Sequence, residues 1–257
     1  MQSGSVITTR DLSKNFGVPV LKNINLDIYA GEIIGYIGPN GAGKSTTIKI
    51  LTGIIPDFEG DATILGLDVR KDIIEIKKRI GYIPENAALY ETLTPLEYLD
   101  FVGQLYKMDR EQVDRKVKDL LTLFELSDEM DSRMTTFSKG MRQKVLLIAG
   151  MIHNPSILFL DEPLSGLDAN AVILVKEILT QLKSSGKTIF YSSHLMDVVE
   201  KISDRVMIIN KGELIANGTF EELNSQPRGS LERIFTELTG STEHQRAASD
   251  FISILKG

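Results

Sequence analysis

The chain has 257 residues, 42% of them hydrophobic, which is the composition of a globular protein long enough to bury a core. Its formal net charge is −6 with acidic and basic residues interspersed, so it offers no broad basic surface and we expect no nucleic-acid partner. Cysteine is absent, which excludes disulfides and cysteine nucleophiles, and no apolar run approaches the roughly 18 residues of a membrane span, so we expect a cytoplasmic, soluble protein.

The first elements in chain order are predicted strands. Alternating apolar residues indicate the first two, and a more continuous apolar run indicates a third that enters the core. A Gly-rich loop and a helix follow, and then short strands, another helix and a further strand. These elements are expected at residues 6–16, 21–29, 31–38, 38–53, 61–69, 72–79 and 80–84.

The middle of the chain changes to helices. From Pro95 to about His153 three helical patterns follow one another without a strand, which predicts an all-helical subdomain inserted into the sheet. Strands and helices then alternate again, as in a mostly parallel sheet covered by helices. The predicted fold is α/β, with a mostly parallel core sheet, an antiparallel β subdomain and the helical insertion at about 95–153. We expect one domain over residues 1–240 and a helical tail over 241–257.

The segment GPNGAGKST fits the phosphate-binding loop pattern G-x-x-x-x-G-K-[ST], also called Walker A, which identifies a P-loop NTPase. It lies between an apolar strand and a predicted helix, the context that this motif requires. Backbone N–H groups of such a loop surround phosphates, the lysine neutralises the β- and γ-phosphates, and the serine hydroxyl binds Mg²⁺. We therefore expect ATP to contact Gly38, Pro39, Asn40, Gly41, Ala42, Gly43, Lys44, Ser45 and Thr46.

Polar side chains follow two later strands. Asp161 and Glu162 come directly after the apolar run ILFL, and His194 follows TIFYSS. Because ligands bind at the carboxyl ends of parallel strands, these side chains are expected to face the nucleotide. Asp161 is predicted to bind Mg²⁺, Glu162 to polarise the attacking water, and His194 to contact the γ-phosphate.

With these motifs in this order, the chain resembles the ATP-binding subunit of an ATP-binding cassette (ABC) transporter over about residues 4–240. The segment LSGLD at 164–168 is similar to the family loop that crosses to a partner subunit, and SSHLMDVVE carries the family's switch histidine, His194. Phe16 falls where the family stacks an aromatic ring on adenine. The resemblance thus implies the ABC ATPase domain, with Phe16 as a further ATP-binding residue.

The family signature loop, typically LSGGQ, is here FSKGM at residues 137–141. The variant SKGMRQ resembles the ABC-2 or multidrug export-type branch. In the family this loop contacts the ATP bound to another subunit, so the resemblance assigns Ser138 and Gly140 to the partner chain's ATP. Lys139 adds a positive charge where the common loop has glycine, and its contact, with phosphate or with solvent, is left open.

A second departure is Glu85 in GYIPEN, where the family has glutamine beside Mg²⁺ and the attacking water. The resemblance implies that Glu85 contributes to the metal site. The alternative is that its carboxylate points to solvent and never approaches the metal. In either case the loop 84–94 resembles the family segment that reports nucleotide state to a membrane partner.

The function that the resemblance implies is hydrolysis of ATP to ADP and phosphate, coupled to transport. Two ATP molecules would hold this chain against a second copy or a sibling subunit, and opening after hydrolysis would drive a separate membrane permease. The chain would then be peripheral on the inner face of the cell membrane. The C-terminal segment SLERIFTELTG resembles export-type members, which favours export over import.

Three other functions are compatible with a P-loop. A soluble ABC-type switch acting on the ribosome or on DNA usually has two cassettes or a long coiled coil, and the sequence has neither. A P-loop kinase would leave the signature loop and LSGLD unexplained. A module that binds ATP without hydrolysing it is disfavoured by the intact Glu162.

Overall fold

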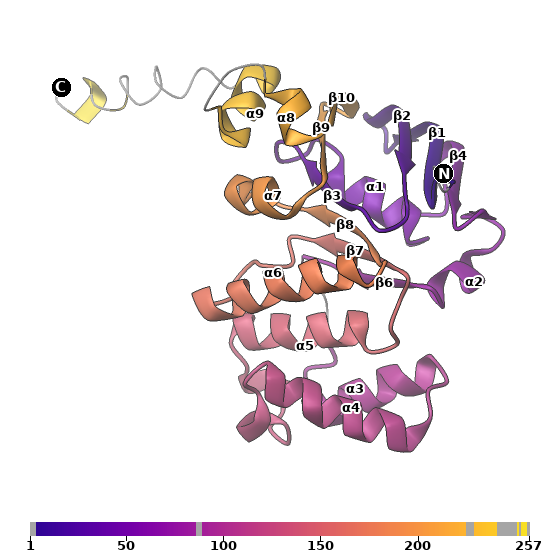
Figure 1. Cartoon of the computed structure of the whole chain (residues 1–257), viewed down its shortest axis with the longest axis vertical. Helices are drawn as coiled ribbons and strands as arrows, with labels where there is room; N and C mark the ends of the chain where they lie inside the picture. Colours follow the sequence, from indigo (N-terminus) through magenta and orange to yellow (C-terminus); the bar gives the residue numbers. More distant parts are fainter. Residues whose placement is uncertain (1–3, 86–88, 225–228, 241–250, 252, 256–257) are drawn as a thin grey trace.

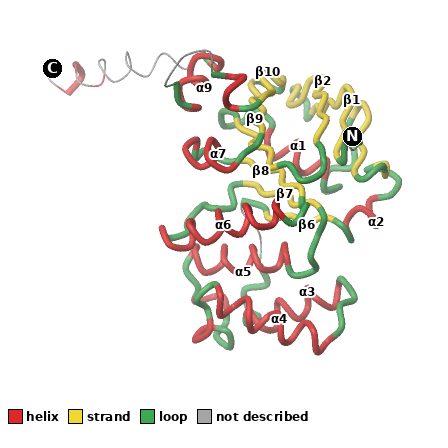
Figure 2. The backbone as a smooth tube through the Cα atoms, viewed as in Figure 1, coloured by secondary structure: helices red, strands yellow, loops and turns green. Residues whose placement is uncertain are grey.

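The computed structural model describes residues 4–85, 89–224, 229–240, 251 and 253–255. Within these residues the strands form two sheets, which lie in the upper and middle parts of the molecule in Figure 1, while α3 and α4 form its lower end. Figure 2 shows the same division, with strands above and only helices and loops below. The predicted α/β fold with an antiparallel sheet, a mostly parallel sheet and a helical region is confirmed.

The antiparallel sheet is built from the first part of the chain in the order β2-β1-β4-β5. Ile7 is paired with both Ile28 and Ile64, and all three side chains are fully buried. One face of this sheet therefore covers the core, which explains the alternating pattern of the sequence. Its strands are β1 (Ile7–Asn15), β2 (Pro19–Ile28), β4 (Glu59–Ile64) and β5 (Leu67–Asp68).

The second sheet has the order β10-β9-β3-β8-β7-β6, and all of its neighbouring strands are parallel except the edge pair β9 and β10. Every residue of β3, β7 and β8 is buried, as expected for strands covered on both faces. The strands are β3 (Ile33–Ile37), β6 (Ile80–Ile83), β7 (Ile157–Asp161), β8 (Thr188–Ser192), β9 (Arg205–Asn210) and β10 (Glu213–Gly218).

The helices begin where the sequence supplies capping residues. Thr94 and Glu97 form a capping box with Pro95 in the first turn of α3, and Asp109 caps α4. The described helices are α1 (Lys44–Leu51), α2 (Ile73–Lys77), α3 (Pro95–Leu105), α4 (Arg110–Leu123), α5 (Lys139–Met151), α6 (Ala169–Ser184), α7 (Met196–Ile202), α8 (Phe220–Leu223) and α9 (Leu231–Thr239). The short α8 and the 3₁₀ turns Ser127–Glu129 and Met134–Thr136 were not expected from the sequence.

Helix α5 joins the helical region to the sheet. It packs against α3 and α4 on one side and against β6 on the other, and eight consecutive residues from Gln143 to Gly150 are buried. Helices α3, α4 and α5 lie between β6 and β7 in the chain, but the domain boundaries at about 95–153 and 240 stay predictions. Most of the predicted tail 241–257 lies outside the described residues.

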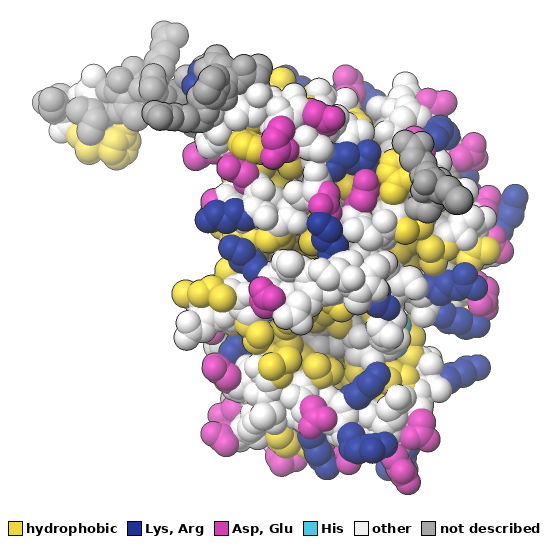
Figure 3. All heavy atoms as spheres, in the orientation of Figure 1, with side chains coloured by type: hydrophobic (Ala, Val, Ile, Leu, Met, Phe, Trp, Pro, Cys, Tyr) yellow, Lys and Arg dark blue, Asp and Glu magenta, His cyan; other side chains and the backbone are white. Residues whose placement is uncertain are grey.

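The described surface carries mixed charge. Acidic and basic side chains are interspersed over the face in Figure 3, in line with the composition. In the part of the chain that the structure describes, no helix has the length and apolar character needed to cross a bilayer.

Candidate functional site

The P-loop lies between the end of β3 and the start of α1. Gly43 has φ 115° and Gly41 has φ 77°, values that favour glycine. A Cβ atom at Gly43 would lie 2.5 Å from Leu21 Cδ2, and one at Gly38 would lie 2.3 Å from the Ile209 carbonyl oxygen. The P-loop can therefore pack this closely against Leu21 and Ile209 only because positions 43 and 38 are glycine.

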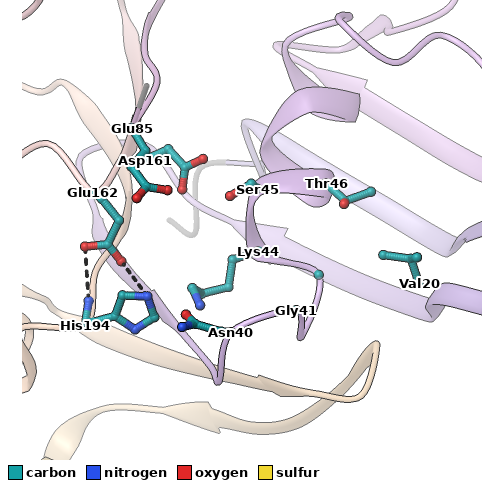
Figure 4. Close-up of a pocket in the computed structure, with 11 residues that line it drawn as sticks. Val20, Asn40, Gly41, Lys44, Ser45, Thr46, Glu85, Asp161, Glu162 and His194 are labelled. Atoms are coloured by element: carbon teal, nitrogen blue, oxygen red, sulfur yellow. Dashed lines mark hydrogen bonds and ion pairs between the residues drawn. The ribbon is translucent and has the colours of Figure 1, made fainter. Parts of the chain in front are cut away.

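A pocket of about 540 Å³ opens over this loop, a size typical of small-molecule sites. Figure 4 shows side chains from the P-loop on one side of the pocket and the acids and the histidine on the other. The pocket is lined by Val20, Asn40, Gly41, Gly43, Lys44, Ser45, Thr46, Glu85, Asp161, Glu162 and His194. Three strand ends of one sheet, those of β3, β7 and β8, thus meet at one cavity, with Glu85 just beyond β6.

Lys44 is buried at the bottom of the P-loop. Its Nζ donates to the carbonyl oxygens of Gly38 at 2.6 Å and Pro39 at 3.2 Å, so the loop itself orients the ammonium group. Burial lowers the pKa of Lys44, while the nearby carboxylates of Glu162 and Asp161 oppose that shift. A cation held in this way is suited to bind phosphate oxygens.

Asp161 ends β7 and is buried beside β8. Its backbone is paired with Ser192, whose hydroxyl donates to Asp161 Oδ1 at 2.6 Å. This hydrogen bond fixes the carboxylate at the edge of the pocket, where Ser45 also lies. Mg²⁺ is usually bound by one or two carboxylates together with water and substrate phosphates, so Ser45 and Asp161 form a suitable donor set.

The carboxylates alone do not form a complete metal site. Among the described residues, no group of three or more His, Asp or Glu side chains converges to hold a metal ion. Glu85 lines the same pocket and lies near Asp161 in Figure 4, although its side chain is exposed. The structure therefore brings Glu85 to the pocket, and its contact with a metal stays a prediction.

Glu162 adopts a backbone conformation that is uncommon for a residue with a side chain. Its φ is 49°, and its N–H donates to the Ser192 carbonyl oxygen at 3.1 Å. Strained residues of this kind occur preferentially at functional sites. The turn directs the carboxylate back toward the pocket, next to His194 (Figure 4).

The Glu162 carboxylate is bound by the segment that follows β8. Oε2 accepts hydrogen bonds from the His194 N–H at 3.3 Å and from Ser193 Oγ at 3.4 Å. Oε1 lies 3.3 Å from His194 Nε2, which makes an ion pair only when the imidazole is protonated, and it accepts no hydrogen bond from the described residues. Burial raises the pKa of Glu162, while His194 and Lys44 oppose that shift. A carboxylate with a raised pKa is suited to accept a proton near neutral pH.

Several predicted residues lie outside the lining of this pocket. Gly38, Pro39 and Ala42 belong to the P-loop but do not line the cavity, and the Phe16 ring is 56% exposed on the β1–β2 turn. Lys14 Nζ lies over that ring, 4.7 Å from its centroid. The stacking of Phe16 on adenine stays a prediction.

Ser138 and Gly140 are also absent from the lining of the pocket. They lie at the N-terminus of α5, where Ser138 Oγ accepts a hydrogen bond from the Met141 N–H at 3.2 Å and caps the helix. Both residues are partly or fully exposed. The P-loop and the signature segment 137–141, the two segments predicted to bind ATP phosphates, are thus separate in the structure.

Two groups at this site were not predicted from the sequence. Val20 lines the pocket from β2, and the pair Ser192 and Ser193 holds the two acids. The dipeptide Ser-Ser before His194 was a usable signal for the second group, because it ends a strand at the same edge as Asp161. No signal in the sequence pointed to Val20.

The fold and this pocket define a P-loop NTPase. The model of the ABC transporter family matches residues 21–165, which is more than half of the chain. The ABC transporter ATP-binding protein NatA of Bacillus subtilis is 37% identical over 237 residues, covering 90% of this chain and 96% of NatA. The linearmycin resistance ATP-binding protein LnrL of the same organism is 35% identical over 225 residues, covering 87% of this chain and 72% of LnrL.

A solved structure described as the ATP-binding subunit of an ABC transporter has a TM-score of 0.85 and 32% identity, covering 91% of this chain and 99% of that one. The chain belongs to the ABC transporter ATP-binding family, and the predicted resemblance is confirmed. It is an ATP-binding and ATP-hydrolysing subunit of a transporter. The alternatives of a ribosome- or DNA-directed switch and of a P-loop kinase are not favoured by these relatives.

Proposed function

We propose that the pocket binds ATP with Mg²⁺ and that two chains close around two ATP molecules to drive a membrane permease. The observation that carries this proposal is the separation of the P-loop pocket from the signature segment 137–141. Lys44, Glu162 and His194 line one pocket, whereas none of the residues lining it belongs to the signature segment that contains Ser138. Because the signature segment does not line the pocket of its own chain, it can contact the ATP that is bound to a second chain.

Within the pocket, each side chain has a distinct part in hydrolysis. Lys44 and the P-loop N–H groups bind the β- and γ-phosphates, while Ser45 and Asp161 would hold Mg²⁺, which neutralises phosphate charge when bound. Glu162 orients a water molecule and accepts its proton, because its pKa is raised by burial. His194 holds the Glu162 carboxylate and would reach the γ-phosphate.

A groove beside β6, lined also by residues of α3 and α5, is suited to the permease. It has a volume of about 400 Å³ and its lining is mainly apolar, with Tyr82, Pro84, Tyr98 and Leu146 among the lining residues. Pro84 lines this groove while the next residue, Glu85, lines the ATP pocket. A partner seated in the groove would therefore contact the segment that meets the nucleotide.

The branch supports a direction of transport and a location for the chain. The SKGMRQ variant and the relative LnrL, named for linearmycin resistance, support export as the direction. The chain would act in the cytoplasm, bound to the inner face of the membrane through its permease. Its partner in the ATP dimer would be a second copy or a sibling subunit.

The test of the dimer is the dependence of ATP turnover on chain concentration. The rate per chain is expected to rise with concentration and then level off, because a monomer has an incomplete site. The measurement is phosphate release with Mg²⁺ and saturating ATP. A rate per chain that stays constant down to concentrations at which sedimentation finds only monomers would contradict the composite site.

For Glu85, replacement by glutamine is expected to change the Mg²⁺ concentration that gives half-maximal turnover. The removed charge lies at the same pocket as Asp161 and Glu162, so the attraction for a divalent cation should weaken by several fold. Glu75→Gln, which removes an exposed carboxylate on α2 that pairs with Lys78, is the matched control. An unchanged Mg²⁺ dependence in Glu85→Gln would favour the alternative in which this carboxylate only meets solvent.

A further inference from the structure

The first turns of α5 lie against the loop 163–168, which follows the hydrolytic acids. Lys139 Nζ donates to Ser165 Oγ at 2.8 Å, and one turn later Gln143 Nε2 donates to the Pro163 carbonyl oxygen at 2.9 Å. Positions four residues apart share one face of a helix, so both side chains reach the same loop. The Gln143 contact is buried, whereas the Lys139 contact is exposed at the rim.

The backbones of the two segments also approach closely. A Cβ atom at Gly140 would lie 2.6 Å from the Gly166 carbonyl oxygen. Gly166 has φ 80°, and a Cβ atom there would lie 2.9 Å from Lys139 Cδ, so the lysine stem crosses directly over this glycine. At the far end of the contact, Lys144 Nζ lies 3.7 Å from Asp168 Oδ2. The loop is held along its whole length by one helix face.

This contact connects two functional segments of the same chain. The loop begins directly after Glu162, which acts on the chain's own ATP, and α5 begins directly after Ser138, which is proposed to reach the partner's ATP. Lys139 stands where the common signature loop has an uncharged glycine, so it adds a positive charge to this segment. Its ammonium group is bound to Ser165, so it is engaged within its own chain.

We propose that Lys139 is a positioning residue that ties the loop 163–168 to the N-terminus of α5, so that both segments approach a partner chain as one unit. This inference rests on the proposed dimer and adds a specific part for a residue that the family pattern does not explain. The alternative is that Lys139 binds the partner's phosphates directly. The two mechanisms differ in whether the effect of replacing Lys139 on dimerisation depends on Ser165.

The experiment uses the full chain in a Glu162→Gln background with Mg²⁺ and ATP, and measures the chain concentration at which half of the protein is dimeric. Lys139→Met retains the stem over Gly166 but removes the donor. It is expected to raise this concentration about fivefold, the effect of losing one exposed hydrogen bond. Lys139→Arg retains a charged donor and is expected to restore dimerisation. Lys118→Met on α4, where Lys118 pairs with Asp114, is the control for loss of a surface lysine.

Ser165→Ala separates the two mechanisms. If Lys139 acts through Ser165, the double variant is expected to be no worse than either single variant. Additive losses, or full dimerisation by Lys139→Met, would overturn the positioning role. Additive losses would instead favour direct contact with phosphate.

Hydrogen exchange in the isolated monomer tests the contact without a dimer. Faster exchange of the amides of residues 165–167 in Lys139→Met is expected, and an unchanged rate would contradict the proposal. If Glu162→Gln itself fails to dimerise with ATP, the proposed dimer fails. In that case faster exchange would still support the contact within the chain, but its part in approaching a partner would be lost with the dimer.

Discussion

Replacing Glu162 with glutamine is expected to slow ATP turnover by about 100-fold or more, the usual contribution of a general base, while ATP stays bound. The amide has nearly the same shape as the carboxylate but cannot accept a proton from water. Because opening follows hydrolysis, the variant should accumulate as a closed dimer when ATP and Mg²⁺ are present. Phosphate release and size-exclusion chromatography measure the two effects, and an unaltered rate would remove Glu162 from catalysis.

The control for this variant is Glu75→Gln, which removes an exposed carboxylate that pairs with Lys78 on the surface. A second readout is the pH profile. Since burial raises the pKa of Glu162, the wild-type rate should fall on acidification at a pH above the ordinary Glu value of about 4.3, because the protonated acid is no longer a base. The residual rate of Glu162→Gln should lack this fall.

The raised pKa of Glu162 affects the stability of the fold in the opposite direction: acidification lowers the rate but favours folding through this group. A carboxyl whose pKa is raised in the folded state favours folding when it is protonated, and this contribution is lost as the pH rises through the folded value. Acidification through the raised pKa of Glu162 therefore does not destabilise the fold through this group. A lower rate without a lower unfolding temperature would identify the protonation of the base as the cause.

The parts of the site that depend on neighbouring residues alone could be predicted from the sequence. The P-loop needs glycine where φ is positive, a lysine at the start of a helix and an apolar strand before it, and all of these lie within residues 33–51. The order of strands and helices along the chain was also predictable, because apolar periodicity depends only on residues that are close together in the sequence. The three helices of the middle segment were predicted from their helical patterns, and in the structure Thr94, Asp109 and Ser138 cap them.

The parts that depend on strand order could not be predicted. The hydrogen bond between Ser192 and Asp161 exists because β8 is the neighbour of β7, a fact that no local pattern carries. Val20 reaches the pocket because β2 crosses the P-loop, where its carbonyl oxygen would lie 3.1 Å from a Cβ atom at Gly43. The contact between Lys139 and Ser165 likewise depends on the packing of α5 against a loop 26 positions away.

Ser138→Arg is expected to abolish cooperative ATP turnover while ATP binding to the monomer is retained. Ser138 lies outside the lining of its own pocket, so a bulky cation there would block only the approach of the partner's phosphates. The substitution also removes the cap of α5, which costs about 1 kcal/mol. Asp109→Ala removes the cap of α4, away from the signature segment, and is the control for the loss of a helix cap.

Mixing two inactive chains tests the shared site most directly. Lys44→Ala loses its own phosphate contacts but retains Ser138, whereas Ser138→Arg retains Lys44. A dimer of one chain of each kind contains one site built from an intact Lys44 and an intact Ser138. For two sites that turn over independently, random pairing in an equal mixture restores about one quarter of the wild-type rate, since half of the dimers have one of two sites intact. A mixture no more active than its separate components would mean that each chain completes its own site, because then no pairing could bring the two intact residues together.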